Sequence, residues 1–180
     1  MKKTVLFIQG GGDNGYEADA PLVKSLQDAL GTSYTVIYPK LGSDNDAADF
    51  GWPEEIGKQI AAVSEEFIIV AHSLGASMLL KYLSENKVAT KAKRIFLLAA
   101  PFWSGKEKWK EGLKLKTDFA ARLPDDYQFY FYQCKDDEEV PFDQLAIYRQ
   151  HLPSATFREF DKGGHQLGEN VRLVGEDIKR

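Results

Sequence analysis

The sequence has little cysteine, little net charge and no long apolar segment. Cys134 is the only cysteine among 180 residues, so a scaffold held by intrachain disulfides is excluded. A formal net charge of −4 gives no general attraction for nucleic acids or anionic membranes. The longest apolar stretch, residues 95–103, is too short to cross a bilayer. We therefore expect a cytoplasmic protein without a nucleic-acid or membrane partner.

Six short runs of aliphatic, β-branched and aromatic residues recur along the chain. Most of them are continuous, which is typical of strands covered on both faces. Between them apolar residues recur at helical spacing, as in Leu22, Leu26 and Leu30. This alternation predicts a single α/β domain over residues 1–180, with three layers: a mostly parallel sheet of about six strands and helices on both faces. The expected strands are 4–8, 34–38, 67–71, 94–99, 128–134 and 156–160.

The segment 102–126 departs from this alternation because lysines and tryptophans are interleaved in it. It could be a patch for an anionic partner. Because the cluster is short and the whole chain is acidic, an amphipathic helix with its lysines in water is the simpler interpretation. Its inward-facing residues would be Trp109, Leu113, Phe119 and Leu123.

Ser73 stands at an expected turn between a strand and a helix, within the pentapeptide Ala71-His72-Ser73-Leu74-Gly75. A nucleophile on so tight a turn needs small residues two positions before and two positions after it, and Ala71 and Gly75 meet this need. Ser73 could instead only cap the helix, as serine often does. A capping box would have Glu or Gln at position 76, where the chain has alanine. We predict Ser73 as a nucleophile.

A serine nucleophile needs a base, and in this architecture the base follows a later strand. The chain has three histidines. His72 precedes the serine and should point away from the nucleophilic side of the turn, and His151 lies at an expected helix end. His165 follows two glycines just after the last expected strand, where a flexible loop can return to the sheet edge. It is the candidate base.

The acid that orients the base should follow the fifth expected strand, where four adjacent carboxylates run from Asp136 to Glu139. Asp137 is the first candidate and Asp136 the second. Glu138 and Glu139 are expected to be solvated.

The serine pentapeptide, the acidic loop ending in Val140-Pro141 and the Gly164-His165 pair occur in an order that resembles the α/β-hydrolase superfamily. Within it, the chain is similar to compact serine hydrolases typified by retinoblastoma-binding protein 9. The resemblance implies a minimal α/β-hydrolase core with strand order 2-1-3-4-5-6, and a small lid at 102–126. It favours Asp137 through an Asp-x-x-Val-Pro spacing. The chain departs from the superfamily at Gln9 and Ala71, where histidine and glycine are common.

The glycines at positions 10, 12 and 15 also fit a dinucleotide-binding fingerprint. That fingerprint requires an acidic residue at the end of the second strand, where this chain reads Tyr38-Pro39-Lys40. A glycine loop can instead present a backbone N–H to an oxyanion. We predict an oxyanion hole formed by the backbone N–H groups of Gly11 and Leu74.

Together these residues predict a carboxylesterase-like serine hydrolase that forms an acyl-enzyme with a small acyl substrate. The reaction requires no metal and no cofactor. The alternative is a hydrolase-fold protein that acts mainly by binding a protein partner. The sequence leaves open the acyl group, the oligomeric state and the choice between esters, thioesters and amides.

Overall fold

Six parallel strands form one sheet in the order β2-β1-β3-β4-β5-β6 in the computed structural model, which describes residues 2–12, 14–87 and 91–180. The predicted three-layer fold and strand order are confirmed. Each strand lies within one residue of its expected bounds. The strands are β1 (Lys3–Ile8), β2 (Tyr34–Ile37), β3 (Phe67–His72), β4 (Arg94–Leu98), β5 (Gln128–Cys134) and β6 (Thr156–Phe160).

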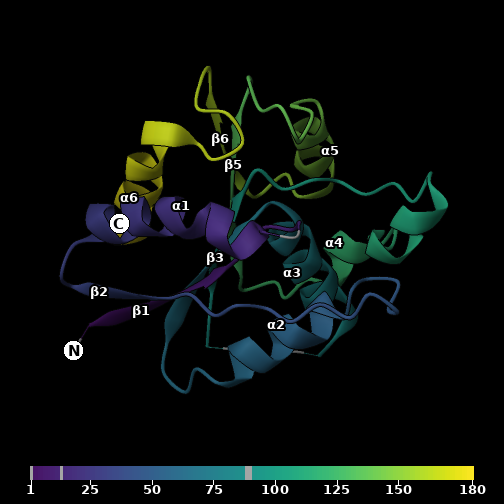
Figure 1. The fold of residues 1–180 in the computed structure, drawn as a ribbon, viewed down its shortest axis with the longest axis horizontal. Helices are drawn as coiled ribbons and strands as arrows, with labels where there is room; N and C mark the ends of the chain where they lie inside the picture. Colours follow the sequence, from purple (N-terminus) through teal and green to yellow (C-terminus); the bar gives the residue numbers. More distant parts are fainter. Residues whose placement is uncertain (1, 13, 88–90) are drawn as a thin grey trace.

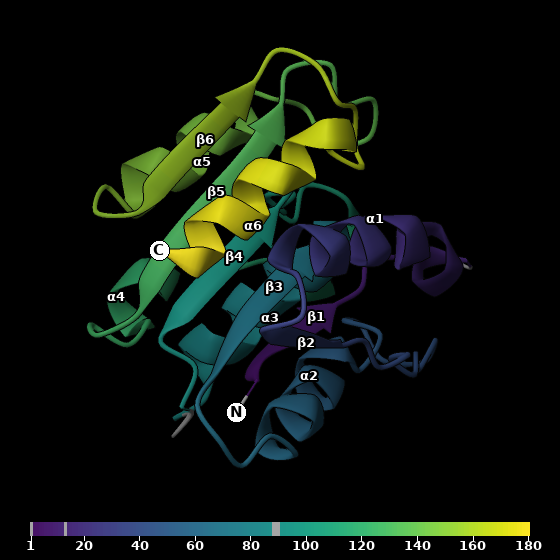
Figure 2. The ribbon, with the colours of Figure 1, turned by 90° about the vertical axis from the view of Figure 1, so that its left-hand side faces the viewer.

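Helices cover both faces of this sheet (Figure 1). Figure 2 shows α1 and α6 on one face, with α3 and α5 behind the sheet. None of the helices in the described part of the chain is long and apolar enough to span a membrane. The helices are α1 (Gly15–Leu30), α2 (Trp52–Ala61), α3 (Ser73–Glu85), α4 (Phe119–Arg122), α5 (Gln144–His151) and α6 (Val171–Lys179), with 3₁₀ helices η1 (Lys108–Leu113) and η2 (Gly168–Asn170).

The central strands are mostly apolar because both of their faces are buried. In β1, Val5 and Phe7 join the core beneath α1 and α6, whereas Leu6 and Ile8 join the core beneath α2 and α3. Side chains of a strand alternate between the two faces, so a strand covered on both sides needs apolar residues at every position. The edge strand β6 is only half-buried, and its run of residues is correspondingly mixed.

The segment 102–126 differs from the single amphipathic helix that its sequence predicts. It forms η1 and the one-turn helix α4, so no continuous helical face runs along it. Leu113, Phe119 and Leu123 are buried as expected, but the prediction for Trp109 is wrong because 61% of this residue is exposed. Its ring packs edge-on against Trp103 instead, beneath the ammonium group of Lys110.

All six strands run in the same direction, so the loops that follow them meet at one edge of the sheet. The glycine loop follows β1 and Ser73 follows β3. The acidic loop follows β5, and His165 follows β6. The fold therefore collects the predicted site residues, which are far apart in sequence, at a single edge.

Candidate active site

Ser73 lies at the junction where β3 ends and α3 begins, with no loop between them. Its φ of 51° places it in the left-handed region, which non-glycine residues rarely adopt. Gly75 lies so close to β1 that an added Cβ would be 2.1 Å from the carbonyl oxygen of Gln9. The small residue two positions after the serine is therefore required by the approach of α3 to the end of β1.

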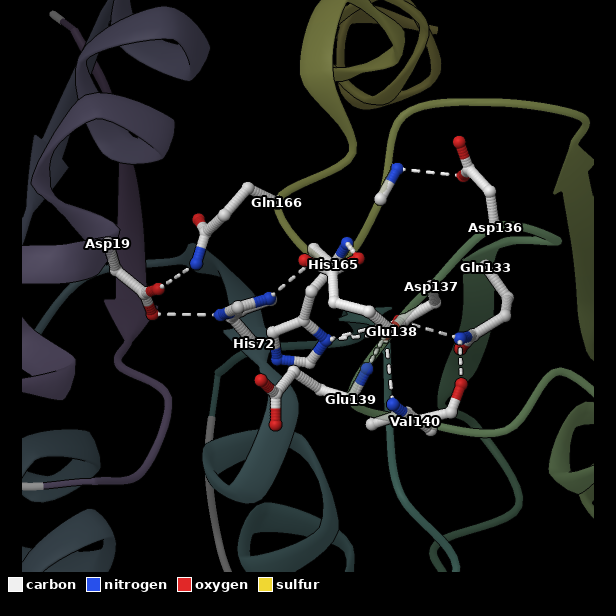
Figure 3. A network of polar contacts seen from close by, with 11 residues as sticks. Asp19, His72, Gln133, Asp136, Asp137, Glu138, Glu139, Val140, His165 and Gln166 are labelled. Atoms are coloured by element: carbon white, nitrogen blue, oxygen red, sulfur yellow. Dashed lines mark hydrogen bonds and ion pairs between the residues drawn. The ribbon is translucent and has the colours of Figure 1, made fainter.

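The imidazole of His165 is held by the carboxylate of Asp137 (Figure 3). Nδ1 of His165 is 3.0 Å from Oδ1 and 3.1 Å from Oδ2 of Asp137. The Asp137 side chain is fully buried, and it also accepts the backbone N–H groups of Glu139 and Val140, each at 2.9 Å. The carboxylate accepts a further hydrogen bond from Gln133 Nε2 at 2.8 Å. These donors fix its orientation toward the histidine.

This contact shifts the pKa of both partners. Burial by itself lowers the pKa of His165, but the hydrogen bond and negative charge of Asp137, with smaller contributions from Glu139 and Asp19, raise it above its ordinary value. Burial raises the pKa of Asp137, yet hydrogen bonds from His165, Val140 and Glu139 bring it below its ordinary value. Asp137 is thus an acceptor, and Nδ1 of His165 carries its proton. In the neutral ring, Nε2 is then the acceptor.

Two further carboxylates of the acidic loop, on either side of Asp137, hold the loop that carries His165. Asp136 accepts the backbone N–H of Gly163 at 3.2 Å and that of Gly164 at 2.8 Å. Glu138 accepts the backbone N–H of His165 at 3.3 Å, so this residue, although exposed, does more than the solvated role expected of it. Of the two aspartates that the sequence left as candidates, Asp137 contacts the imidazole and Asp136 contacts the backbone.

A pocket of about 840 Å³ opens at this edge of the sheet. Ser73, His165, Gly11 and Leu74 all line it, whereas Asp137 lies behind His165. One wall is aromatic and aliphatic, and another carries Glu138 and Glu139. The residues of the apolar wall are Phe50, Trp103, Trp109 and Leu113.

Gly11 and Leu74, the residues of the predicted oxyanion hole, both line the pocket. The N–H of Gly10 is donated to Asp19, so it is not the oxyanion donor. The next backbone N–H along the glycine loop is that of Gly11. Leu74 lies in the first turn of α3, where N–H groups have no helical acceptor. Gly11 and Leu74 are in close contact, since a Cβ on Gly11 would lie 2.7 Å from Leu74 Cδ2. No group of three metal-ligating side chains occurs among the described residues.

Three residues that sequence reasoning missed belong to this network. Gln133 supports Asp137, while Gln166 and Asp19 contact each other on the other side of His165 from Asp137 (Figure 3). The sequence does contain a signal for Asp19. This residue stands three positions before Leu22 and seven before Leu26, on the apolar face of α1. A carboxylate on a buried helix face needs partners.

Comparison with known proteins is consistent with this geometry. A family model described as serine hydrolase matches residues 24–170. A comparison with curated protein sequences gives no significant match. Similar solved structures include a mutant of the meta-cleavage product hydrolase CumD, with a TM-score of 0.79 and 16% identity over 99% of this chain and 92% of that chain.

The esterase domain of a Rhodothermus marinus protein is also similar, with a TM-score of 0.69 and 16% identity over 98% of this chain and 84% of that chain. The ydeN gene product of B. subtilis has a TM-score of 0.66 and 18% identity over 99% of this chain and 97% of that chain. The narrower likeness to the retinoblastoma-binding protein 9 family stays a prediction. The family match and the shared fold together place the chain in the serine hydrolase family, with an α/β-hydrolase fold.

Proposed function

We propose that the protein hydrolyses carboxylic esters or related acyl compounds through an acyl-enzyme on Ser73. The observation that carries the proposal is the position of His165: its Nδ1 is hydrogen-bonded to Asp137, and its ring lines the same pocket as Ser73. A serine on a left-handed strand-to-helix turn, a base and an orienting carboxylate are the groups that acyl transfer needs.

In the proposed reaction, Nε2 of His165 takes the hydroxyl proton as Ser73 Oγ bonds to the acyl carbon. Asp137 stabilises the imidazolium that forms. The N–H groups of Gly11 and Leu74 hold the developing oxyanion, and one such donor is typically worth about 3 kcal/mol in the transition state. His165 then gives its proton to the leaving group. Water, with His165 again as base, releases the acid from Ser73.

A fluorophosphonate probe, which labels activated serines, tests this assignment. The wild-type protein is expected to be labelled, and Ser73→Ala is expected to lose the label because no other serine lies at the strand-to-helix turn beside His165. Ser25→Ala, an exposed position on α1, is the matched control and should label normally. Labelling of Ser73→Ala, or a folded wild-type protein without labelling or ester turnover, would contradict the proposal. Capture of a protein partner by such an inactive protein would support the binding alternative.

The apolar wall indicates which acyl groups the pocket accepts. Trp103 is fixed by a hydrogen bond of 3.0 Å from its Nε1 to Ser77 Oγ, and its ring packs against Trp109. We propose that the segment 102–126, which carries both tryptophans, acts as a small lid. Its apolar lining should favour acyl chains that displace water from this wall.

We expect p-nitrophenyl butyrate to have a kcat/KM about 15-fold above that of the acetate, because each of its two additional CH₂ groups gains ~0.8 kcal/mol on burial. In Trp103→Ala this ratio should fall toward one, while turnover of the acetate changes little. Trp109→Ala should reduce the ratio less, because Trp109 is largely exposed. Steady-state kinetics with both esters checks this, and an unchanged ratio in Trp103→Ala would show that the acyl chain does not contact this wall.

A further inference from the structure

Beside His165 lies a buried pair of ionisable side chains, Asp19 and His72, that the mechanism above does not use. The side chains of Asp19, on α1, and His72, at the end of β3, are only 2% and 1% exposed. Nδ1 of His72 is 2.9 Å from Oδ2 of Asp19. Burying ionisable groups costs free energy unless they are paired and hydrogen-bonded. Two questions follow: which atoms of this pair carry protons, and what the pair does for the site.

The acceptors around His72 determine where its protons are. Nε2 of His72 is 3.0 Å from the backbone carbonyl oxygen of His165, and a carbonyl can only accept, so Nε2 carries a hydrogen. Nδ1 faces the Asp19 carboxylate. The carboxylate accepts two further donors, the N–H of Gly10 at 2.6 Å and Gln166 Nε2 at 3.0 Å.

Both oxygens of Asp19 accept N–H donors, Oδ2 from Gly10 and Oδ1 from Gln166, as an ionised carboxylate does. Burial raises its pKa, but the hydrogen bond and charge of His72, with the donors from Gln166 and Gly10, bring the pKa below its ordinary value. An ionised carboxylate offers no proton to Nδ1, so Nδ1 of His72 must carry a hydrogen as well. Both ring nitrogens are then protonated, and the pair is neutral as a whole.

We infer that Asp19 and His72 form a buried ion pair, with His72 held as an imidazolium, that positions the glycine loop and the His165 loop at the active site (Figure 3). Asp19 binds the glycine loop through Gly10 and the residue after the proposed base through Gln166. His72 binds the backbone of the base itself. The effect of this ion pair on turnover rests on the proposed function, in which the two loops supply the base and the oxyanion donor.

The packing around the pair supports a positioning role. A Cβ on Gly10 would lie 3.0 Å from His72 Nδ1 and 3.2 Å from Asp19 Oδ2, so the glycine lets its backbone approach both groups. The rings of His72 and His165 are 4.6 Å apart between centroids. The other titratable groups that act on the pair and on His165 are Tyr38 at the end of β2, and Asp137 and Glu139 in the acidic loop.

Nitrogen NMR of protein labelled with ¹⁵N-histidine tests the proton assignment directly. The chain has three histidines, so His151→Gln and His165→Gln suffice to assign the spectrum. Both ring nitrogens of His72 are expected to be protonated at pH 7 in the wild-type protein, because each of them faces an acceptor. In Asp19→Asn, His72 should become neutral, with its proton on Nε2. An unprotonated ring nitrogen on His72 in the wild-type protein at pH 7 would overturn the inference, whether or not the protein is a hydrolase.

Ester kinetics tests the positioning role. In Asp19→Asn we expect kcat and the rate of fluorophosphonate labelling to fall about tenfold to a hundredfold, with KM within about twofold, because small displacements of reacting groups are costly. The matched control Asp28→Asn, at an exposed position on α1, should match the wild-type protein. His72→Gln, which keeps a donor toward the His165 carbonyl, should retain more activity than His72→Ala. Wild-type kcat in a folded Asp19→Asn protein, or a loss confined to KM, would refute the role.

Discussion

Substitution of His165 by alanine is expected to lower kcat for a p-nitrophenyl ester by about 10⁶-fold, the scale seen when a triad loses its base. The physical reason is that Ser73 then has no group to take its proton, and the leaving group has none to supply one. KM should change little, because His165 forms only part of the pocket wall. Initial rates at saturating substrate measure the loss.

His151→Ala is the matched control, since this residue is exposed at the end of α5 and stacks on Phe102 away from the pocket lining. Its kcat should remain close to that of the wild-type protein. A loss in His165→Ala of tenfold or less would mean that another group acts as the base.

Asp137→Asn is expected to lower kcat by about 10⁴-fold, because an amide cannot hold the Nδ1–H tautomer of the histidine as a carboxylate does. Asp136→Asn should have a much smaller effect, since an amide oxygen can still accept the N–H groups of Gly163 and Gly164. Kinetics of the two variants separates the two adjacent aspartates. Equal losses would contradict the assignment of Asp137 as the residue that orients His165.

The dependence of kcat/KM on pH has a predicted direction in the wild-type protein and in Asp137→Asn. Wild-type kcat/KM should fall as the pH drops through the pKa of His165, since only the neutral ring accepts the serine proton. That midpoint should lie above 6.5, because Asp137 raises the pKa of His165. In Asp137→Asn the hydrogen bond from the charged ring to a carboxylate is lost, so the midpoint should move to lower pH.

The strands and the positions of the proposed catalytic groups were predictable because each depends on local sequence. Continuous apolar runs locate strands covered on both faces, and β1 and β3 follow this rule closely. Ser73 and His165 follow strands at recognisable turns. The segment 102–126 was less predictable because its apolar positions suit one long helix, whereas the chain forms two short helices there, and Trp109 of η1 lines the pocket.

The supporting contacts depend on the tertiary arrangement. Asp136 and Asp137 are adjacent in sequence, and which of them faces His165 depends on how the loops after β5 and β6 meet. Asp19 contacts His72 across 53 residues and Gln166 across 147. The sequence shows only that a carboxylate stands on an apolar helix face. Its partners become visible when the sheet brings α1, β3 and the loop after β6 together.

The backbone conformation of Ser73 has a consequence for evolution under selection for stability. A non-glycine residue at φ 51° carries strain on the order of 1–3 kcal/mol, which the rest of the fold must offset. Glycine would adopt the same turn without this cost, and would leave no hydroxyl at the pocket. The contacts of β3 and α3 with the rest of the fold must therefore hold the turn in this conformation. In the proposed function Ser73 is the nucleophile, so selection for activity would keep serine at this position against selection for stability.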